Sequence, residues 1–466
     1  MRGNTILGLF FLLSAISVCG QNGERPPNII VIFCDDLGYG DLSTYGSVWN
    51  QTPELDRMAS EGVRFTNFYA GAPVCTPSRA GLLTGCYARR VDLDLDAKNN
   101  WVLFPVGKKG INPKEKILPE ILKSAGYATA IFGKWHLGDQ PQFLPNEHGF
   151  DYWFGLPYSN DMEREKGGNP PLPLMRNGEI VEQREQHRAF DQSTLTKRYT
   201  EEAIAWMDNH KDRPFFVYLP HTMPHNPVAA RPEFYEKTNN PKSGFGAAVA
   251  EIDWSTGRIR EYLKANALED NTLVLFTSDN GGAMRRGASN GILRGGKGNV
   301  YEGGVRVPMI ACWPGKIGTG GTCHQMASVI DFYPTFAKLA GIPLDLSVKR
   351  DGTDISDYLF HPQKRRADRP YYFWHVGYLR ALRLGDWKLM LTGPFLKEDR
   401  GMVLYNLKED PSETTDRSQE HPEIVARLLD MAEEQKKALG ERNDYGPEVR
   451  RTVWVENPVP LIKQSK

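Results

Sequence analysis

The sequence predicts an α/β protein with a large, mostly parallel β-sheet flanked by helices, followed by a smaller C-terminal α+β subdomain. Two observations carry this prediction. Short runs of β-branched and aromatic residues alternate with helical patterns over most of the chain, which is the rhythm of βαβ units. These runs are continuously apolar, as in strands that are buried on both faces. After about Pro362 the sequence pattern changes.

The elements of the main sheet are expected in a simple order. Strands are predicted at 28–33, 129–132, 215–219 and 272–277. Helices are predicted at 119–125, 195–210 and 246–264. Because ligands bind at the carboxyl ends of the strands in open α/β sheets, residues that follow these strands are the first place to look for a site.

A polar link at 365–370 separates the C-terminal region, which we expect to form a small antiparallel sheet and a helix. Its strands are predicted at 371–374, 381–383, 387–391 and 403–405. The helix, at about 421–439, has an apolar stripe formed by Ile424, Leu428, Leu429 and Ala432. We therefore divide the 466 residues into a leader (1–20), a first domain (21–364) and a C-terminal subdomain (365–466).

Charge and hydropathy exclude two classes of partner. The chain has 57 Lys and Arg residues and 57 Asp and Glu residues, so no overall positive field favours a nucleic acid. Outside the N-terminus, no apolar run is long enough for a transmembrane segment.

The N-terminus is typical of a signal peptide. Met1-Arg2 is a basic start, residues 6–18 are apolar, and the small residues before Gln21 suit cleavage near Gly20. We expect an exported protein, periplasmic or secreted. The alternative is a lipoprotein anchored through Cys19, to which Val18 is a poor fit.

The six cysteines do not form a disulfide scaffold in so long a chain. Cys19 lies in the leader, and the other five leave at least one thiol unpaired because their number is odd. Whether Cys312 and Cys323 pair is left open by the sequence. Cys75 is the best candidate for a thiol kept free for chemistry.

Cys75 opens the run Cys75-Thr76-Pro77-Ser78-Arg79-Ala80, in which we expect a helix to begin. Thr76 suits the N-cap and Pro77 the first helical position. The thiol is then at the positive end of a helix dipole, with Arg79 one turn along, where an anion binds well. The alternative is a cysteine that is only a small buried hydrophobic residue.

Oxygen ligands follow two of the buried strands. Asp35 and Asp36 come after the first strand, and Asp279 and Asn280 come after the strand at 272–277. Carboxylate and amide oxygens suit Ca²⁺ or Mg²⁺ and not a soft metal. Each pair alone also fits a turn or a helix cap, but both pairs at strand ends favour a metal site.

Positive and titratable side chains follow other strands. Lys134 and His136 alternate on a segment expected to be extended, so both side chains should leave the same face. Either His221 or His225, after the strand at 215–219, is a candidate general acid. Lys297 lies in a glycine-rich loop that lacks the P-loop spacing. Each of these also fits an ordinary surface or core residue.

Together, these motifs resemble the type I, formylglycine-dependent sulfatases. The segment from Cys75 to Gly85 matches their Cys-x-Pro-Ser-Arg-Ala-x-Leu-x-Thr-Gly signature, and Gly133-Lys134-Trp135-His136-Leu137-Gly138 resembles the second signature. The likeness runs from about residue 28 to about residue 407 and is strongest to bacterial polysaccharide sulfatases of the N-acetylgalactosamine-sulfatase and arylsulfatase A branch. It implies an alkaline-phosphatase-like fold.

The resemblance also implies a mechanism. A separate maturation enzyme oxidises residue 75 to formylglycine (3-oxoalanine), whose hydrate attacks the sulfur of a sulfate ester. One Ca²⁺, with Mg²⁺ as the lesser candidate, is held by residue 75 together with Asp35, Asp36, Asp279 and Asn280.

The remaining roles are also implied by the family. The formylglycine hydroxyls are held by Arg79, Lys134 and His136, with Asp279 helping to deprotonate the attacking hydroxyl. His136 then takes a proton from the sulfated intermediate, which lets the intermediate collapse to the aldehyde and release sulfate. The sulfate is bound by Lys134, His225 and Lys297, and His225 protonates the leaving alcohol.

Two alternatives remain beside a sulfatase. One is a phosphatase or phosphodiesterase of the same superfamily, although the ligands for a second metal are not apparent. The other is a catalytically inactive glycan-binding homologue. The expected substrate is a sulfated carbohydrate, attacked from a chain end in glycosaminoglycan or marine-type polysaccharide fragments. Candidate sugar contacts are Asp161, Arg176, His187, His375 and Tyr378.

Overall fold

The computed structural model describes residues 25–163, 168–183, 191–391 and 401–462, and its centre is a mixed ten-stranded sheet. Five neighbouring strands run parallel, in the order β9 (Thr272–Ser278), β1 (Asn28–Cys34), β8 (Phe215–Pro220), β4 (Ala128–Lys134) and β5 (Tyr152–Leu156). Beyond β9 lie β10 (Met309–Cys312), β2 (Val63–Phe65) and β11 (Gly321–Cys323), and beyond β5 lie β6 (Pro173–Arg176) and β7 (Glu179–Gln183). The predicted fold class is confirmed.

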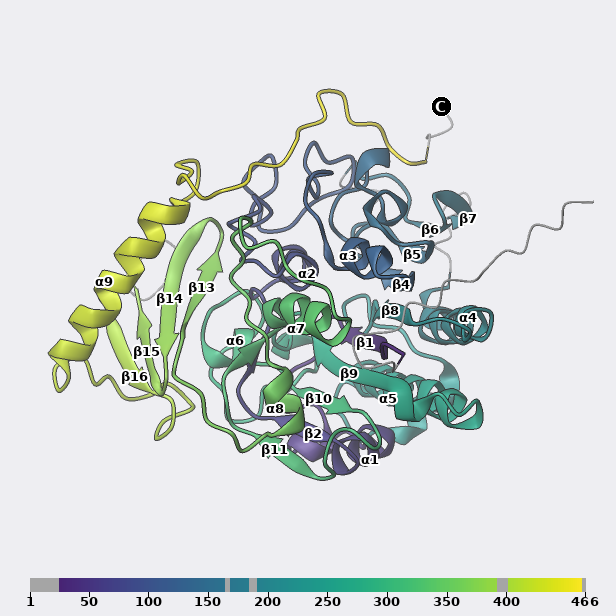
Figure 1. Cartoon of the computed structure of the whole chain (residues 1–466), viewed down its shortest axis with the longest axis horizontal. Coiled ribbons are helices and arrows are strands. Elements are labelled where there is room, and N and C mark those ends of the chain that lie inside the picture. Colours follow the sequence, from purple (N-terminus) through teal and green to yellow (C-terminus); the bar gives the residue numbers. More distant parts are fainter. Residues whose placement is uncertain (1–24, 164–167, 184–190, 392–400, 463–466) are drawn as a thin grey trace, which may run out of the picture.

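Helices cover both faces of this sheet (Figure 1). One face packs against α2 (Cys75–Thr84), α3 (Leu118–Ser124) and α7 (Phe332–Leu339). The other packs against α1 (Pro53–Ser60), α4 (Leu195–Asp208) and α5 (Ser243–Ala265). Because side chains alternate along a strand, β1 sends Ile29 and Phe33 to the first face and Ile30 and Ile32 to the second.

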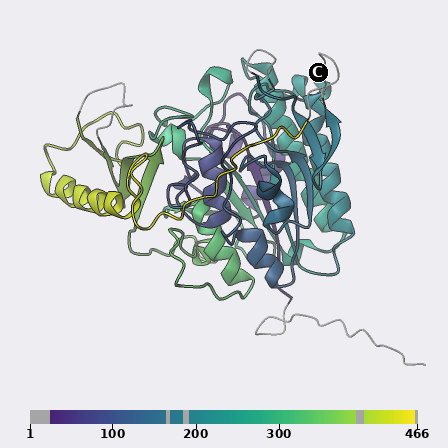
Figure 2. The ribbon, with the colours of Figure 1, turned by 90° about the horizontal axis from the view of Figure 1, so that it is seen from above.

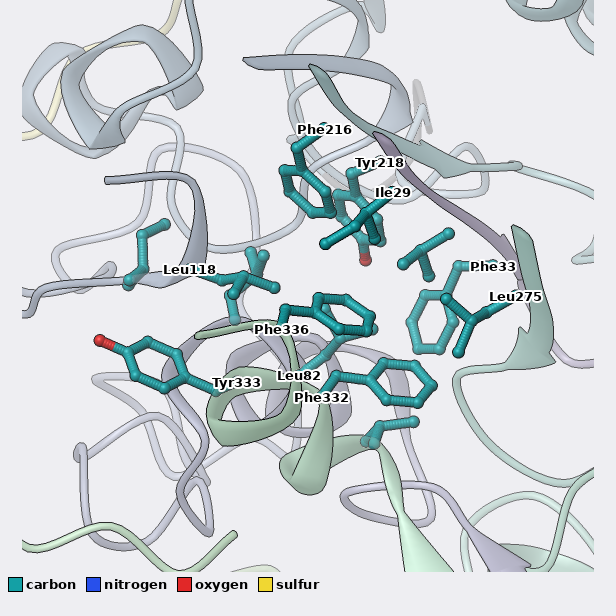
Figure 3. Close-up of a cluster of buried hydrophobic side chains, with 14 of the residues drawn as sticks. Ile29, Phe33, Leu82, Leu118, Phe216, Tyr218, Leu275, Phe332, Tyr333 and Phe336 are labelled. Carbon is teal, nitrogen blue, oxygen red and sulfur yellow. The ribbon is translucent and has the colours of Figure 1, made fainter. Parts of the chain in front are cut away.

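The core on the first face is rich in aromatic side chains. Figure 3 shows Phe332 and Phe336 of α7 pointing toward residues of β1 and β8. The rings of Phe332 and Phe336 stack, with centroids 5.2 Å apart, and both side chains are fully buried. This packing fixes α2 and α7 against the strands that carry the site.

The C-terminal region forms a separate four-stranded antiparallel sheet covered by a helix (Figures 1 and 2). Its strands are β13 (Pro370–His375), β14 (Tyr378–Leu384), β15 (Trp387–Met390) and β16 (Val403–Asn406), and the helix is α9 (Pro422–Leu439). The short elements α6 (Glu302–Val305), α8 (Ser356–Phe360), β3 (Phe68–Tyr69) and β12 (Ala327–Ser328) lie in the larger part.

A buried ion cluster joins the small sheet to the large part. Lys388 on β15 is fully buried and contacts Glu302 at 2.9 Å and Glu413 at 2.8 Å. Its ammonium group also donates to the Val300 carbonyl at 2.7 Å. Three partners satisfy this lysine at the junction, in the way that a buried charge requires.

After α9 the chain returns to the larger part of the molecule, where Figures 1 and 2 show it running across the molecule in yellow. The backbone N–H of Arg450 donates to the Arg90 carbonyl at 2.7 Å, and the backbone N–H of Val455 donates to the Lys108 carbonyl at 2.8 Å. Farther along, Val459 exchanges two hydrogen bonds with the Gln140 side chain. We call residues 441–462 the return segment. The division at residue 365 stays a prediction.

No helix in the described ranges is both long and apolar enough to cross a membrane. The predicted signal peptide and Cys19 lie outside the described residues. The five cysteines that are described are all buried and unpaired, so Cys312 and Cys323 form no disulfide in this structure.

Candidate functional site

The predicted site residues come together at the carboxyl edge of the five parallel strands. Asp35 and Asp36 follow β1, Asp279 and Asn280 follow β9, and Lys134 ends β4. Adjacent parallel strands end at the same edge, so residues distant in sequence become neighbours there. Residue 75 reaches this edge from the first turn of α2.

Three potential ligand atoms converge around residue 75. The Cys75 sulfur and one carboxylate oxygen each from Asp35 and Asp279 lie within 4.8 Å of one another, and all three residues are buried. Asp36 belongs to the same group, because it lies with Asp35 and His225 in a second cluster of the same size.

Two oxygens in this cluster are left for a ligand. Asp35 Oδ1 and Asn280 Oδ1 are buried without a hydrogen-bond partner among the described residues. The Asn280 amide nitrogen donates to Asp36 Oδ1 at 2.8 Å, which leaves its oxygen as an acceptor. Buried acceptors in a set of hard oxygen donors fit a divalent cation of the Ca²⁺ or Mg²⁺ type.

Fixed positive charges surround the acidic cluster. The Lys134 ammonium donates to Asp35 Oδ2 at 2.6 Å, and Arg79 NH2 donates to Asp279 Oδ2 at 2.8 Å. Both cationic side chains are fully buried. Lys297 approaches from its glycine-rich loop and pairs with Asp36 at 2.8 Å. The site therefore holds negative and positive groups side by side out of water.

These charges set the pKa values of the carboxyl groups in opposite directions. Burial alone raises the pKa of Asp35, but Lys134, His225, Arg79 and Lys297 outweigh it and hold that pKa below its usual range. For Asp279, burial and then repulsion from Asp35 raise the pKa. A bound cation would favour the ionised form of both carboxyl groups.

The thiol of Cys75 is poorly suited to act as a nucleophile itself. Burial raises its pKa, and the nearby charges of Lys134 and Lys297 only partly offset that effect. A raised pKa keeps the sulfur protonated at neutral pH, whereas the thiolate is the reactive form.

The histidines of the site differ in their surroundings. His225 Nδ1 donates to the Asn160 amide oxygen at 2.9 Å, and its Nε2 lies 3.7 Å from Asp36. His136 Nε2 donates to the Leu103 carbonyl at 2.9 Å, while its buried Nδ1 has no partner among the described residues. Burial lowers the pKa of both residues. Of the two candidate histidines, His225 lies in the cluster with Asp35 and Asp36, whereas His221 Nε2 lies 3.3 Å from the Ser255 hydroxyl.

Two local expectations were wrong. The helix begins at Cys75 itself, with Val74 in extended conformation as N-cap, so Thr76 lies inside the first turn. The Thr76 hydroxyl instead accepts from Leu103 and donates to the His136 carbonyl, which ties two loops to the helix. His136 has a φ of +63°, so it and Lys134 do not lie on one extended segment.

A cleft of about 930 Å³ opens above the cluster. Cys75, His136, His225 and Lys297 line it, and so does Asp161, one of the candidate sugar contacts. Its rim carries the half-exposed indoles of Trp101 and Trp454, the latter from the return segment.

The other candidate sugar contacts lie elsewhere. Arg176 pairs with Glu202 at 2.9 Å instead of lining the cleft. His375 lines a smaller cavity beside it, and the Tyr378 ring packs against Arg380. His187 lies outside the described residues.

The comparison with protein-family models decides what this arrangement is. The Sulfatase model matches residues 27–342, which is more than half of the chain. The chain belongs to the sulfatase family. A second model, described as N-sulphoglucosamine sulphohydrolase, C-terminal, matches residues 296–438 of this sulfatase.

Individual relatives agree. Mus musculus N-acetylgalactosamine-6-sulfatase is 37% identical over 432 residues, covering 89% of this chain and 82% of its own. Homo sapiens arylsulfatase A is 38% identical over 402 residues, which cover 81% of this chain and 77% of that protein. The crystal structure of Ps i-CgsB with k-i-k-neocarrahexaose has a TM-score of 0.78 and 31% identity, covering 88% of this chain and 93% of that one. The protein is a sulfuric ester hydrolase with the expected alkaline-phosphatase-like fold.

Sequence reasoning missed several residues around the site of this sulfatase. Ser159 accepts from Lys134 at 3.1 Å, and Asn160 fixes His225. Both follow β5, so the rule of looking after each buried strand would have found them had the strand at 152–156 been predicted. No local sequence pattern indicates that Trp454 lies at the rim of the cleft, because its position depends on the path of the return segment.

Proposed function

We propose that this sulfatase removes sulfate from a carbohydrate, using residue 75 in its oxidised, formylglycine form and one bound Ca²⁺. One observation carries the proposal: residue 75 lies at the floor of a cleft, within 4.8 Å of the carboxylate oxygens of Asp35 and Asp279. Cys75 is only 3% exposed and its thiol has a raised pKa, which supports a modified residue as the nucleophile.

The cation would be held by Asp35, Asp36, Asp279 and Asn280, with residue 75 facing it. Its part would be to neutralise negative charge on the sulfate oxygens. The donors are all hard oxygens, two of them without a partner in the described structure, and this supports Ca²⁺ over a soft metal.

In its formylglycine form, residue 75 would supply the two hydroxyl groups of the hydrated aldehyde, one for attack and one for release of sulfate. Arg79 is held rigidly by Asp279 and by the Lys134 carbonyl, so its guanidinium is a preorganised positive charge beside residue 75. His136 has a neutral imidazole whose Nδ1 is not engaged by the described residues, so it is suited to accept a proton.

The sulfate group would be bound by Lys134, Lys297 and His225. Asp36 raises the pKa of Lys297 although burial opposes it, so this lysine stays charged. Burial lowers the pKa of His225, and a negatively charged substrate beside it would raise that pKa again. His225 can then donate a proton from Nε2 to the leaving alcohol, with Nδ1 held by Asn160.

The substrate is proposed to be a glycosaminoglycan or marine-type polysaccharide fragment, attacked from its end. The relative named N-acetylgalactosamine-6-sulfatase and the structural neighbour in complex with k-i-k-neocarrahexaose support this class. Export through the predicted leader and oxidation of residue 75 by a separate maturation enzyme belong to the same proposal.

The test combines mass and activity. Peptide mass spectrometry of protein from its native host should find residue 75 as formylglycine, and that protein should hydrolyse an aryl sulfate far faster than the matching aryl phosphate. Unmodified Cys75 in all molecules together with no sulfate hydrolysis would support the inactive glycan-binding alternative instead. Position-defined sulfated monosaccharides then identify the sugar.

A further inference from the structure

A second cavity opens beside the cleft, next to the C-terminal sheet. Its volume is about 410 Å³, and Asn100 and Trp101 line both hollows. The rest of its lining includes Gly298, the residue after Lys297, and His375 and Arg380 from β13 and β14. A substrate longer than one sugar therefore meets a second hollow directly beside the first.

Trp101 offers a flat apolar surface between the two hollows. Its side chain is 45% exposed, and its ring centroid lies 5.9 Å from that of His375. A Cβ on Gly298 would lie 3.1 Å from the indole, so the glycine at φ +86° lets the ring rest on this loop. A half-exposed indole held at a cavity wall is suited to pack against a sugar ring.

His375 closes the cavity without adding charge. It hydrogen-bonds the backbone of Gly298, and burial lowers its pKa to about 4, so the imidazole is neutral at physiological pH. This contact joins the C-terminal sheet to the loop that presents Lys297.

Arg380 gives the second cavity its charge. The residue is 3% exposed, and none of the described residues that line the cavity is acidic. Glu441 and Arg442 both act on Arg380 electrostatically, and they shift its pKa in opposite directions. A buried guanidinium at a cavity wall is a favourable partner for a carboxylate or a sulfate.

We propose that the second cavity binds the sugar next to the one that is desulfated, and that Arg380 binds an anionic group on that neighbouring sugar. The group is a carboxylate or a second sulfate, and Trp101 packs against the ring that carries it. This inference rests on the proposed carbohydrate sulfatase function and names residues that select its substrate.

The test uses substrates that differ only in the neighbouring sugar. The sulfated monosaccharide that the mature enzyme hydrolyses best is extended by a glucuronate, by a sulfated hexose or by a neutral hexose, and an aryl sulfate is the reference. In Arg380→Gln, we expect kcat/KM for a charged disaccharide to fall about tenfold to hundredfold relative to the aryl sulfate, mainly through KM. The affected disaccharide shows whether the group is a carboxylate or a sulfate.

Two matched variants control for a general loss of positive charge or of an indole. Arg258→Gln removes an exposed arginine on α5, and Trp49→Ala removes a partly exposed indole. Both variants should leave unchanged the ratio of kcat/KM for a charged disaccharide to kcat/KM for the aryl sulfate. Trp101→Ala should lower kcat/KM for all three disaccharides. An equal loss on the neutral and charged disaccharides in Arg380→Gln, or no change in the ratio, would overturn the proposal for Arg380.

A binding measurement separates this proposal from the catalytic one. Calorimetry with Cys75→Ala protein should detect the charged disaccharide, and the Cys75→Ala/Arg380→Gln protein should bind it about tenfold or more weakly. If the wild-type protein hydrolyses no sulfate ester, the proposed function fails and the binding result still decides the subsite. Equal affinity in the two proteins rejects the subsite even when hydrolysis is intact.

Discussion

At the scale of single residues, the site is a cluster of buried charges in which two oxygens accept no hydrogen bond from the described residues. Asp35, Asp36 and Asp279 face three cationic side chains, and the oxygens without a partner in the described part of the chain are Asp35 Oδ1 and Asn280 Oδ1. Burial without a partner costs about 1–3 kcal/mol for each such group. A bound cation removes this cost, so the site should couple metal binding to stability.

The first prediction concerns that coupling. Ca²⁺ added to chelator-treated protein at a hundred times its dissociation constant should stabilise the fold by about 2.7 kcal/mol, measured as a rise in Tm. Asn280→Leu should abolish the rise, because it removes a ligand oxygen. Asp208→Asn, on the surface of α4, should retain it. If added divalent cations leave the Tm of the chelator-treated protein unchanged, this cluster does not bind a metal.

The second prediction concerns Asn160, which contacts His225 and not the expected position of the reacting atoms. Asn160→Ala frees the imidazole to rotate, so kcat should fall about tenfold to hundredfold, as for other residues that orient a functional side chain. Asn160→Asp should restore part of the rate and shift the alkaline limb of the pH–rate profile to higher pH, since His225 must be protonated to act as a general acid and a carboxylate raises its pKa. The exposed Asn209 gives the matched control, Asn209→Ala. An unchanged pH profile in Asn160→Asp would contradict the role.

At the scale of elements, the long buried strands were predictable, whereas short or partly exposed strands toward the two ends of the sheet were not. β1, β4, β8 and β9 are continuous apolar runs because both of their faces are covered. Strands such as β2, β7 and β11 are short or partly exposed, and their pairing partners lie far along the chain. The residues after the predicted strands were therefore found from sequence, whereas Ser159 and Asn160 were not.

The start of α2 illustrates a second limit. Thr76 has the chemistry of an N-cap, but Val74 takes that position without a side-chain hydrogen bond. The hydroxyl of Thr76 is used for contacts with Leu103 and His136, from loops that local propensity does not report. Tertiary hydrogen bonds outweigh the capping preference here.

The third prediction tests the ion cluster between β15 and α6. Lys388→Met leaves Glu302 and Glu413 buried beside each other, and it should destabilise the protein by about 3–5 kcal/mol. Denaturant unfolding followed by far-UV circular dichroism measures this change. Lys408→Met, at an exposed position after β16, should change stability by less than about 0.5 kcal/mol. Equal stability of the two variants would show that the cluster is not a structural junction.

At the scale of the whole molecule, the return segment makes the two parts of the chain depend on each other. It leaves the C-terminal helix, lies along the larger part of the molecule and contributes Trp454 and Pro458 to the cleft. The site is thus built from segments between residue 35 and residue 458, which is why sequence motifs alone located its floor and not its rim.

The fourth prediction removes the end of that segment. Deletion of residues 453–466 loses the hydrogen bonds of Val455 and Val459, so stability should fall by about 1–4 kcal/mol. KM for a sulfated oligosaccharide should rise more than KM for an aryl sulfate, because one wall of the cleft is lost. Steady-state kinetics on both substrates check this. An equal change for both would assign the segment a purely structural part.

Because the return segment is at the C-terminal end of the described chain, the cleft wall that it forms is synthesised after the rest of the site. Every described strand and helix leaves the ribosome before Trp454 does, so the sheet and its acidic floor can assemble while the cleft still lacks a wall. A message with a late stop codon would then yield a protein with an intact floor and an open rim. Such a protein would retain chemistry on small sulfate esters and lose its hold on sugars.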